Sequence, residues 1–135
     1  MKIYEKSLSL RTTKRIDFIE ITDEVNNVVK SSGISNGICY VFVPHTTAAV
    51  TINENADRSV VKDIISVLNK VIPEDGDYTH SEGNSDAHVK SSLVGCSIQI
   101  FVSDGKLHLG TWQGIYFCEF DGPRNRNVWV KVIGI

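Results

Sequence analysis

One run of seven residues limits the folds open to this chain more than any other stretch. Residues 37–43, Gly-Ile-Cys-Tyr-Val-Phe-Val, are almost continuously apolar. Such a run predicts a central strand that is buried on both faces of its sheet. Pro44 ends the strand, because proline has no N–H to donate to the ladder. His45 follows at once, so the strand would hold its imidazole rigidly, in a place that suits a working side chain.

Strand patterns recur through the rest of the chain. Residues 2–10 alternate and residues 15–21 are mostly apolar, and we expect these two neighbouring strands to pair as a hairpin. Asp104-Gly105 is a strong two-residue signal for a second hairpin. Further strands are predicted over residues 48–52, 97–102, 115–120 and 128–133.

Helical patterns occupy three stretches between these strands. We expect Thr22 to cap the first helix and Asp57 to cap the second, whose apolar side chains are spaced as on an amphipathic helix. The third is predicted over residues 85–94, with Val89 and Leu93 turned toward the core. The order of elements predicts an α+β fold, with mostly antiparallel or mixed β-sheets and two or three helices.

Length and composition exclude several classes of protein. The 135 residues suit a single domain, residues 1–135, and their net charge of −2 argues against a nucleic-acid binder, which normally has a basic face. No apolar run approaches the roughly 18 residues that a membrane-spanning helix needs, and the charged N-terminus is not a signal peptide. Cys39, Cys96 and Cys118 are widely spaced and fit small buried hydrophobes in a reducing compartment. We therefore expect a cytoplasmic protein without nucleic-acid or membrane partners.

Three of the four histidines are candidate functional residues. His45 ends the apolar strand, His80 lies in a long polar loop and His88 lies near the start of the third helix. Each also has a purely structural reading: bound to a neighbouring carbonyl, solvated, or half-buried and satisfied. We predict that the three converge on one pocket, where they would move protons or hold a divalent ion, zinc or magnesium. His108 alternates with two leucines and is predicted to lie on the surface.

Polar side chains near these histidines extend the candidate site. We assign a catalytic role to Glu54, and we expect Glu82 and Asn84 to orient His80 or His88. Arg124 follows a Gly-Pro turn and reads either as solvated charge or as a guanidinium fork for phosphate oxygens. The residues assigned to substrate binding are Thr46, Thr47, Asn55, Glu82, Asn84, Lys90, Thr111, Trp112, Gln113 and Arg124.

The segment Gly110-Thr111-Trp112-Gln113-Gly114 interrupts a predicted strand with a glycine at each end. A strand has little structural use for two such glycines, so we expect them to let a ligand or another backbone come close. Trp112 has a second reading, as a residue that contacts another copy of the chain.

Three segments of the chain closely resemble the YjbQ family. They are residues 45–57, which begin His45-Thr46-Thr47, residues 80–95, and residues 110–124, which end Gly122-Pro123-Arg124. Their order and spacing match over essentially the whole chain. The resemblance implies a homotrimer with sites near subunit contacts. It also implies the coupling of a pyrimidine pyrophosphate to a thiazole phosphate, the side activity for which the family is described as a secondary thiamine-phosphate synthase.

Two functions are consistent with these residues. In the first, the protein is an enzyme from whose substrate pyrophosphate departs, assisted by Arg124 and by a cation that His45, His80 and His88 hold. In the second, it is a non-catalytic homotrimer that binds a metal or a phosphorylated metabolite. Clustered histidines without an evident nucleophile fit both.

Overall fold

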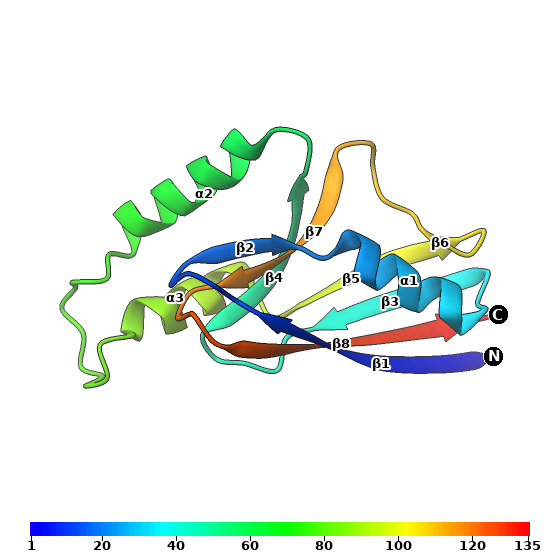
Figure 1. Cartoon of the computed structure of the whole chain (residues 1–135), viewed down its shortest axis with the longest axis horizontal. Helices are drawn as coiled ribbons and strands as arrows, with labels where there is room; N and C mark the ends of the chain where they lie inside the picture. Colours follow the sequence, from blue (N-terminus) through cyan, green and yellow to red (C-terminus); the bar gives the residue numbers. More distant parts are fainter.

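A computed structural model describes residues 1–135 as two antiparallel sheets with three helices, which confirms the predicted α+β fold (Figure 1). The strands are β1 (Lys2–Arg11), β2 (Asp17–Glu20), β3 (Asn36–Phe42), β4 (Ala48–Glu54), β5 (Ser97–Ser103), β6 (Lys106–Leu107), β7 (Gln113–Glu119) and β8 (Asn125–Gly134). The helices are α1 (Thr22–Ser32), α2 (Arg58–Val71) and α3 (Ser85–Val94). One sheet has the strand order β1-β8-β3-β5-β6 and the other β2-β7-β4. No helix is long and apolar enough to cross a membrane.

The main core lies between the inner face of the five-stranded sheet, helix α1 and the three-stranded sheet. Val25 and Val29 of α1 meet Val41 of β3, Val50 of β4 and Phe117 of β7 in one buried cluster. Each such side chain stabilises the fold by roughly 1.5–3 kcal/mol when it is fully buried. This cluster fixes the ends of β3 and β4, and His45 lies in the short connection between them.

Strand β3 is central, as predicted, but it is buried on one face only. Cys39 and Val41 are buried, whereas Tyr40 and Phe42 on the opposite face are 39% and 41% exposed. The expectation of two buried faces is therefore wrong, because α1 and the second sheet cover the inner face alone. The outer face carries aromatic side chains that nothing in the chain covers.

The first two strands do not form the predicted hairpin. Strand β1 pairs with β8, with Lys2 opposite Gly134, whereas β2 pairs with β7 in the other sheet. A strand pattern indicates which residues are extended but not which strand they join. The other predicted hairpin is confirmed: Asp104 and Gly105 both have left-handed φ angles, 53° and 72°, between β5 and β6.

The expected helix caps have different outcomes. Asp57 caps α2 as predicted, because its Oδ1 accepts the backbone N–H of Ser59 at 2.9 Å. Thr22 does not cap α1 but is its first residue. Its hydroxyl instead accepts the N–H of Ile115 at 2.9 Å, which ties α1 to β7.

Helix α3 buries a charged face instead of the predicted apolar one. Val89 and Leu93, expected to face the core, are 45% and 67% exposed, whereas Asp86 and Lys90 are fully buried. Asp86 accepts two hydrogen bonds from Arg15, at 3.2 and 2.9 Å, and one from Lys90 at 2.8 Å. Because each of these charged groups has an oppositely charged partner, this face of α3 can be buried away from water. Periodicity alone could not reveal the pairing with Arg15, 71 positions away.

Candidate functional site

The His45 imidazole is held in one tautomer by the sheet. Its Nε2 accepts the backbone N–H of Asn127 in β8 at 3.0 Å. An accepting Nε2 carries no proton, so the neutral ring has its proton on Nδ1. Nδ1 makes no hydrogen bond within the chain, which leaves one N–H available to a ligand.

Burial is the first cause of a lowered pKa for His45, and the positive charges of Arg126 and Arg124 lower this pKa further. The imidazole is therefore neutral over the physiological pH range, ready to act as a hydrogen-bond donor at a fixed position. The hydrogen bond from Asn127 and the negative charge of Glu119 raise the pKa of His45, but they do not outweigh these effects.

The His45 pKa gives a direct test by NMR. We expect the imidazole of His45 to titrate below the midpoint of the same histidine in a short peptide of residues 43–47, near the usual 6.5. Since the folded-state pKa is lowered, the unfolded state binds more protons, and this contribution to stability is complete above about pH 6.5. It is lost as the pH falls toward the folded value. A folded midpoint at or above that of the peptide would contradict this description of the ring.

His88 connects the other two histidines. A cavity of about 400 Å³ is lined by His45, Thr46 and Ala48 on one side and by His88, Ser91, Ser92, Gly95 and Cys96 on the other. A neighbouring hollow of about 370 Å³ is lined by His80 and His88, whose ring centroids lie 5.3 Å apart in an edge-to-face arrangement. The chain thus joins the three predicted histidines in two adjoining hollows that share His88, rather than in a single one.

A buried ion pair between Arg126 and Glu119 holds the segments around His45 in place. Arg126 is 4% exposed and its guanidinium donates to both carboxylate oxygens of Glu119, through Nε at 2.8 Å and through Nη2. Nη2 also donates to the Thr47 hydroxyl at 2.8 Å. Glu119 further accepts the Thr12 hydroxyl at 2.8 Å. Thr47, expected to bind substrate, is therefore buried and engaged in the scaffold two positions after His45.

Asp121 brings Arg124 beside the start of α3. Its carboxylate accepts Nη2 of Arg124 at 3.0 Å and Nδ2 of Asn84 at 2.9 Å. Arg124 is exposed, so part of its guanidinium stays open to solvent. Asn84, expected to orient a histidine, contacts Asp121 instead. The Glu82 carboxylate lies 3.8 Å from Nε2 of His80, near the ring but beyond hydrogen-bond distance.

Lys90 has no access to these hollows. Its ammonium is fully buried and donates to Asp86 at 2.8 Å and to Asn69 of α2 at 2.9 Å. These bonds make Lys90 a structural residue that joins α3 to α2, not a side chain open to a phosphate.

A second group of predicted site residues lies at the far end of β4. Glu54 ends this strand, and the six steps back to Ala48 beside His45 span about 20 Å. Glu54 accepts the N–H of Asp57 and lies opposite Gln113 of β7. The rest of this group is Asn55, Thr111 and Trp112, of which Trp112 is 63% exposed. Within one chain these residues do not reach His45.

Gly114 allows two side chains of the same chain to approach its backbone closely. A Cβ at this position would lie 2.7 Å from both the Asn55 side chain and the Glu20 carboxylate. The close approach expected there is therefore made by two side chains of the same chain. Asn55 Nδ2 donates to Glu20 at 2.9 Å across this point.

Comparison with known proteins identifies the family of this chain. The family model described as "UPF0047 protein YjbQ-like" matches residues 6–135. The chain belongs to the YjbQ family. It is similar to the UPF0047 protein of Methanocaldococcus jannaschii, with 55% identity over 93% of this chain and 91% of that protein.

Solved structures of YjbQ-family proteins share the fold. The chain is similar to an uncharacterised conserved protein of the YjbQ/UPF0047 family from Clostridium acetobutylicum, with 58% identity, a TM-score of 0.94, and coverage of 95% of this chain and 99% of that one. It is also similar to a protein of unknown function from Sulfolobus solfataricus, with 35% identity, a TM-score of 0.96 and coverage of 99% of both chains. These likenesses support the fold and the family, and their names specify no reaction.

The single YjbQ-family chain does not by itself assemble a complete set of metal ligands. No group of three or more histidine, cysteine, aspartate or glutamate side chains is arranged to hold a metal ion. His80 and His88 are neighbours, but His45 lies with His88 in the other hollow. We therefore assign no chemical step to a metal.

Sequence reasoning missed three residues of this YjbQ-family site. Arg126 reads from its local sequence as solvated charge or as a fork for phosphate oxygens, yet it is in phase with the buried Val128 and Val130 of β8, a signal that it points inward and needs a partner. Cys96, expected to be buried, is exposed and lines the His45 cavity. Ser91 lines the same cavity, and its buried hydroxyl has no hydrogen-bond partner. Nothing in the local pattern around these last two residues distinguishes them.

Proposed function

We propose that the cavity between His45 and His88 is the active site of an enzyme that couples a pyrimidine pyrophosphate to a thiazole phosphate. One observation carries the proposal: His45 is a neutral imidazole in a fixed tautomer, with a free Nδ1–H at a cavity that lacks carboxylates. A donor held at a fixed position stabilises charge that develops on a leaving group. The YjbQ-family membership supports the choice of substrates.

The proposed reaction forms one bond and breaks one. The thiazole attacks a carbon of the pyrimidine substrate, and the bond from that carbon to a pyrophosphate oxygen breaks. The electron pair leaves with pyrophosphate. His45 Nδ1–H donates to the departing oxygen, and the charge of the exposed Arg124 stabilises the anion. His88, shared by both hollows, faces the same ligand from α3.

Assays on the purified protein test this proposal. Incubation with both precursors is expected to release pyrophosphate and form the coupled product, with metal content measured on the same sample. Release of pyrophosphate by the pyrimidine precursor alone would contradict coupling. Binding of either precursor without turnover would favour the alternative, a non-catalytic protein that binds a phosphorylated metabolite.

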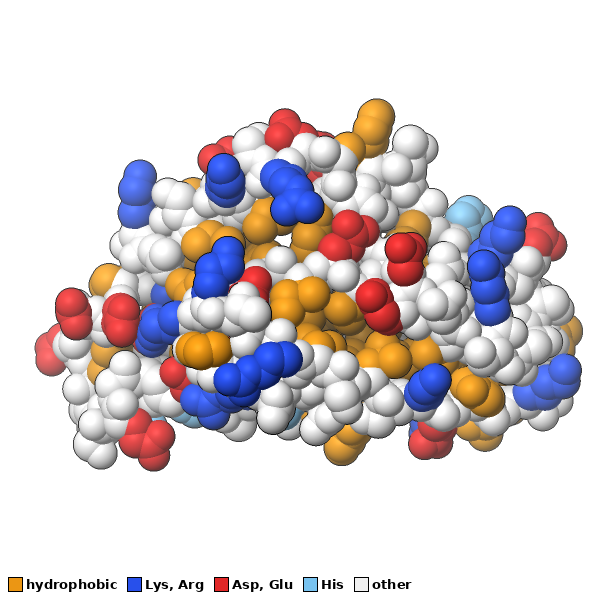
Figure 2. Space-filling model, viewed as in Figure 1, with side chains coloured by type: hydrophobic (Ala, Val, Ile, Leu, Met, Phe, Trp, Pro, Cys, Tyr) orange, Lys and Arg blue, Asp and Glu red, His pale blue; other side chains and the backbone are white.

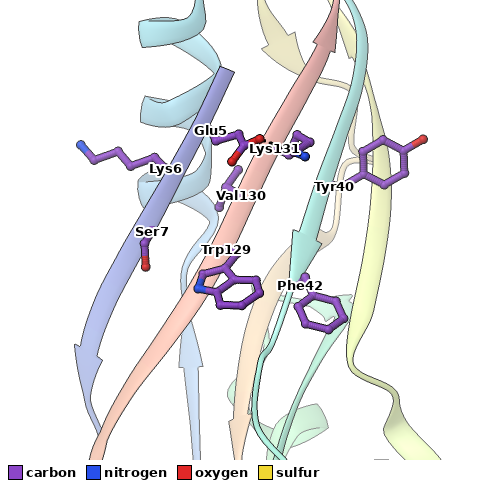
Figure 3. A pocket seen from close by; sticks show the side chains of 8 residues that line it. All are labelled: Glu5, Lys6, Ser7, Tyr40, Phe42, Trp129, Val130 and Lys131. Atoms are coloured by element: carbon purple, nitrogen blue, oxygen red, sulfur yellow. Dashed lines mark ion pairs between the residues drawn. The ribbon is translucent and has the colours of Figure 1, made fainter. Parts of the chain in front are cut away.

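We further propose that the protein is a homotrimer whose sites are completed between copies. The residues around Glu54 and Trp112 lie about 20 Å from His45 in one chain, so only a neighbouring copy can bring the two groups together. The outer face of the five-stranded sheet exposes Tyr40, Phe42 and Trp129 (Figure 3). Large exposed apolar patches mark interaction surfaces.

Figure 3 shows this outer face at close range. Trp129 of β8 and Phe42 of β3 lie side by side, with ring centroids 5.7 Å apart and planes 26° from parallel. They line a hollow of about 720 Å³ together with the exposed Glu5–Lys131 ion pair, whose atoms are 2.9 Å apart. The stacked rings would give a second copy an apolar contact surface. The neighbouring ion pair would fix the position in which that copy binds.

Light scattering on the purified protein tests the assembly. The expected mass is three times the 15.0 kDa of one chain. Trp129→Arg is expected to reduce the mass, since a charge placed in an apolar contact has no partner. The control, Lys30→Ala in the exposed last turn of α1, should leave it unchanged. A monomeric wild-type protein at micromolar concentration would exclude any site shared between copies.

A further inference from the structure

A further hollow, which shares no residue with the histidine hollows, lies between helix α2 and the three-stranded sheet. Its volume is about 260 Å³. Figure 2 shows hydrophobic side chains on this face between α2 and β2, bordered by lysine and arginine side chains. We call this hollow the α2 groove.

The apolar surface of the α2 groove is only partly covered by the chain. Helix α2 has a strongly apolar side, yet none of its residues is fully buried. Val61 and Ile65 on this side face Phe18 of β2 and Tyr116 of β7, whose ring centroids lie 6.5 Å apart. An apolar group that entered the groove would cover both walls and gain about 25 cal/mol for each Å² removed from water.

Three basic side chains at the groove have no partner in the chain. Lys14, Arg58 and Lys62 line it, and none of them forms an ion pair. Arg58 and Lys62 lie one turn apart on α2 and Lys14 comes from the segment before β2, so the cations approach from both walls.

The two acidic residues of the groove are already engaged. Asp17 Oδ2 accepts the backbone N–H of Thr13 at 2.9 Å and its hydroxyl at 3.2 Å. Glu20 Oε2 accepts Nδ2 of Asn55 and the hydroxyl of Thr22, both at 2.9 Å. These donors are neutral, so both carboxylates keep their charge, but three cations against two carboxylates leave the groove with a net charge of +1 above its apolar floor.

We propose that the α2 groove binds a small aromatic carboxylate, with its ring between Val61 and Tyr116 and its carboxylate at Arg58 and Lys62. Apolar walls with a few convergent charged groups are typical of small-molecule sites. Arg58 supplies a fork that matches a carboxylate, and a planar ring fits between a helix side and an aromatic floor. This site is independent of the reaction proposed for the histidine cavity.

The test uses 2-naphthoate as the probe and the full-length ¹⁵N-labelled protein. Naphthoate is expected to shift the backbone amide signals of Val61, Ile65 and Tyr116 in a saturable way. The uncharged 2-naphthalenemethanol should bind about tenfold more weakly, because it lacks the charge that the free cations attract. Equal affinity of the two probes would overturn the proposal, as would naphthoate shifts confined to the outer sheet face around Trp129.

Variants distinguish the contribution of the cations to binding from that of the apolar walls of the groove. The double variant Arg58→Ala, Lys62→Ala is expected to bind naphthoate about tenfold more weakly, and to lose its preference for naphthoate over the alcohol. Lys70→Ala, at the other end of α2 and outside the groove, is the matched control and should bind like the wild type. Val61→Trp fills the groove while keeping the cations, and should abolish binding of both probes. Wild-type binding by the double variant or by Val61→Trp, with an unchanged Tm, would overturn the proposal.

Discussion

Replacing Glu119 by alanine is expected to destabilise the protein by about 3–5 kcal/mol, which is a large part of the 5–15 kcal/mol typical of a domain. The substitution leaves the Arg126 guanidinium buried without its counter-ion and Thr12 without its acceptor. A buried unpaired charge cannot recover its solvation unless the strand ends open. Because Arg126 also holds Thr47, the loop that carries His45 should loosen with it.

Urea unfolding of wild type and variant measures this loss. The control is Glu74→Ala, which breaks an exposed pair with Arg15 at 3.4 Å, away from the proposed interface, and should cost less than about 1 kcal/mol. Although burial raises the pKa of Glu119, the hydrogen bonds from Arg126 and Thr12 outweigh it and keep that pKa below its ordinary value. The stabilisation is therefore complete above the unfolded pKa of about 4.5 and is lost as the pH falls through the folded one. A Glu119→Ala protein as stable as Glu74→Ala would refute the ion-pair account.

Replacing His45 by alanine is expected to remove turnover and most affinity for a phosphorylated ligand, while the free energy of unfolding falls by less than about 1 kcal/mol. The ring is half-buried and accepts a single hydrogen bond, from the amide of the exposed Asn127, which water can satisfy in the variant. Its Nδ1–H has no role within the chain, so its loss should appear in ligand binding and not in stability.

The matched control for His45 is His108→Ala. His108 is exposed and lies beside Ser103, at the opposite end of β5 from the Cys96 that lines the His45 cavity, so neither activity nor unfolding should change. Calorimetric titration with pyrophosphate, combined with urea unfolding, separates the two effects. A His45→Ala variant that keeps its affinity but loses 2 kcal/mol or so of stability would identify a structural histidine, since that is roughly the cost of an unpaired buried group.

The sequence allowed the elements to be predicted more securely than their partners. The Asp104-Gly105 hairpin and the Asp57 cap depend on neighbouring residues, and both are confirmed. The pairing of β1 with β8 and of β2 with β7 depends on residues about a hundred positions away, and the predicted β1–β2 hairpin is wrong. Local patterns carry no information about such distant partners.

The residues of the candidate site show the same difference between what local sequence predicts and what depends on distant partners. His45 and His88 were chosen for their places at a strand end and near a helix start, and they line one cavity. Lys90 is predicted to bind substrate because its local sequence does not show that Asp86 and Asn69 enclose its ammonium. Glu54, just before the Asp57 cap, and Trp112, between two glycines, are predicted site residues from their local sequence, which does not show that the length of β4 separates them from His45.

The strand order also bears on how the protein is made. Strand β8, which follows the other strands of its sheet in the chain, lies between β1, which precedes them, and β3. A ribosome-bound chain that has not released residues 125–134 has no hydrogen-bonding partner for β1 and leaves one edge of β3 bare. The larger sheet must therefore assemble after translation of this segment, through contacts of high sequence separation, which form slowly. Until then, unpaired apolar strand edges would be exposed to chaperones and to other nascent chains.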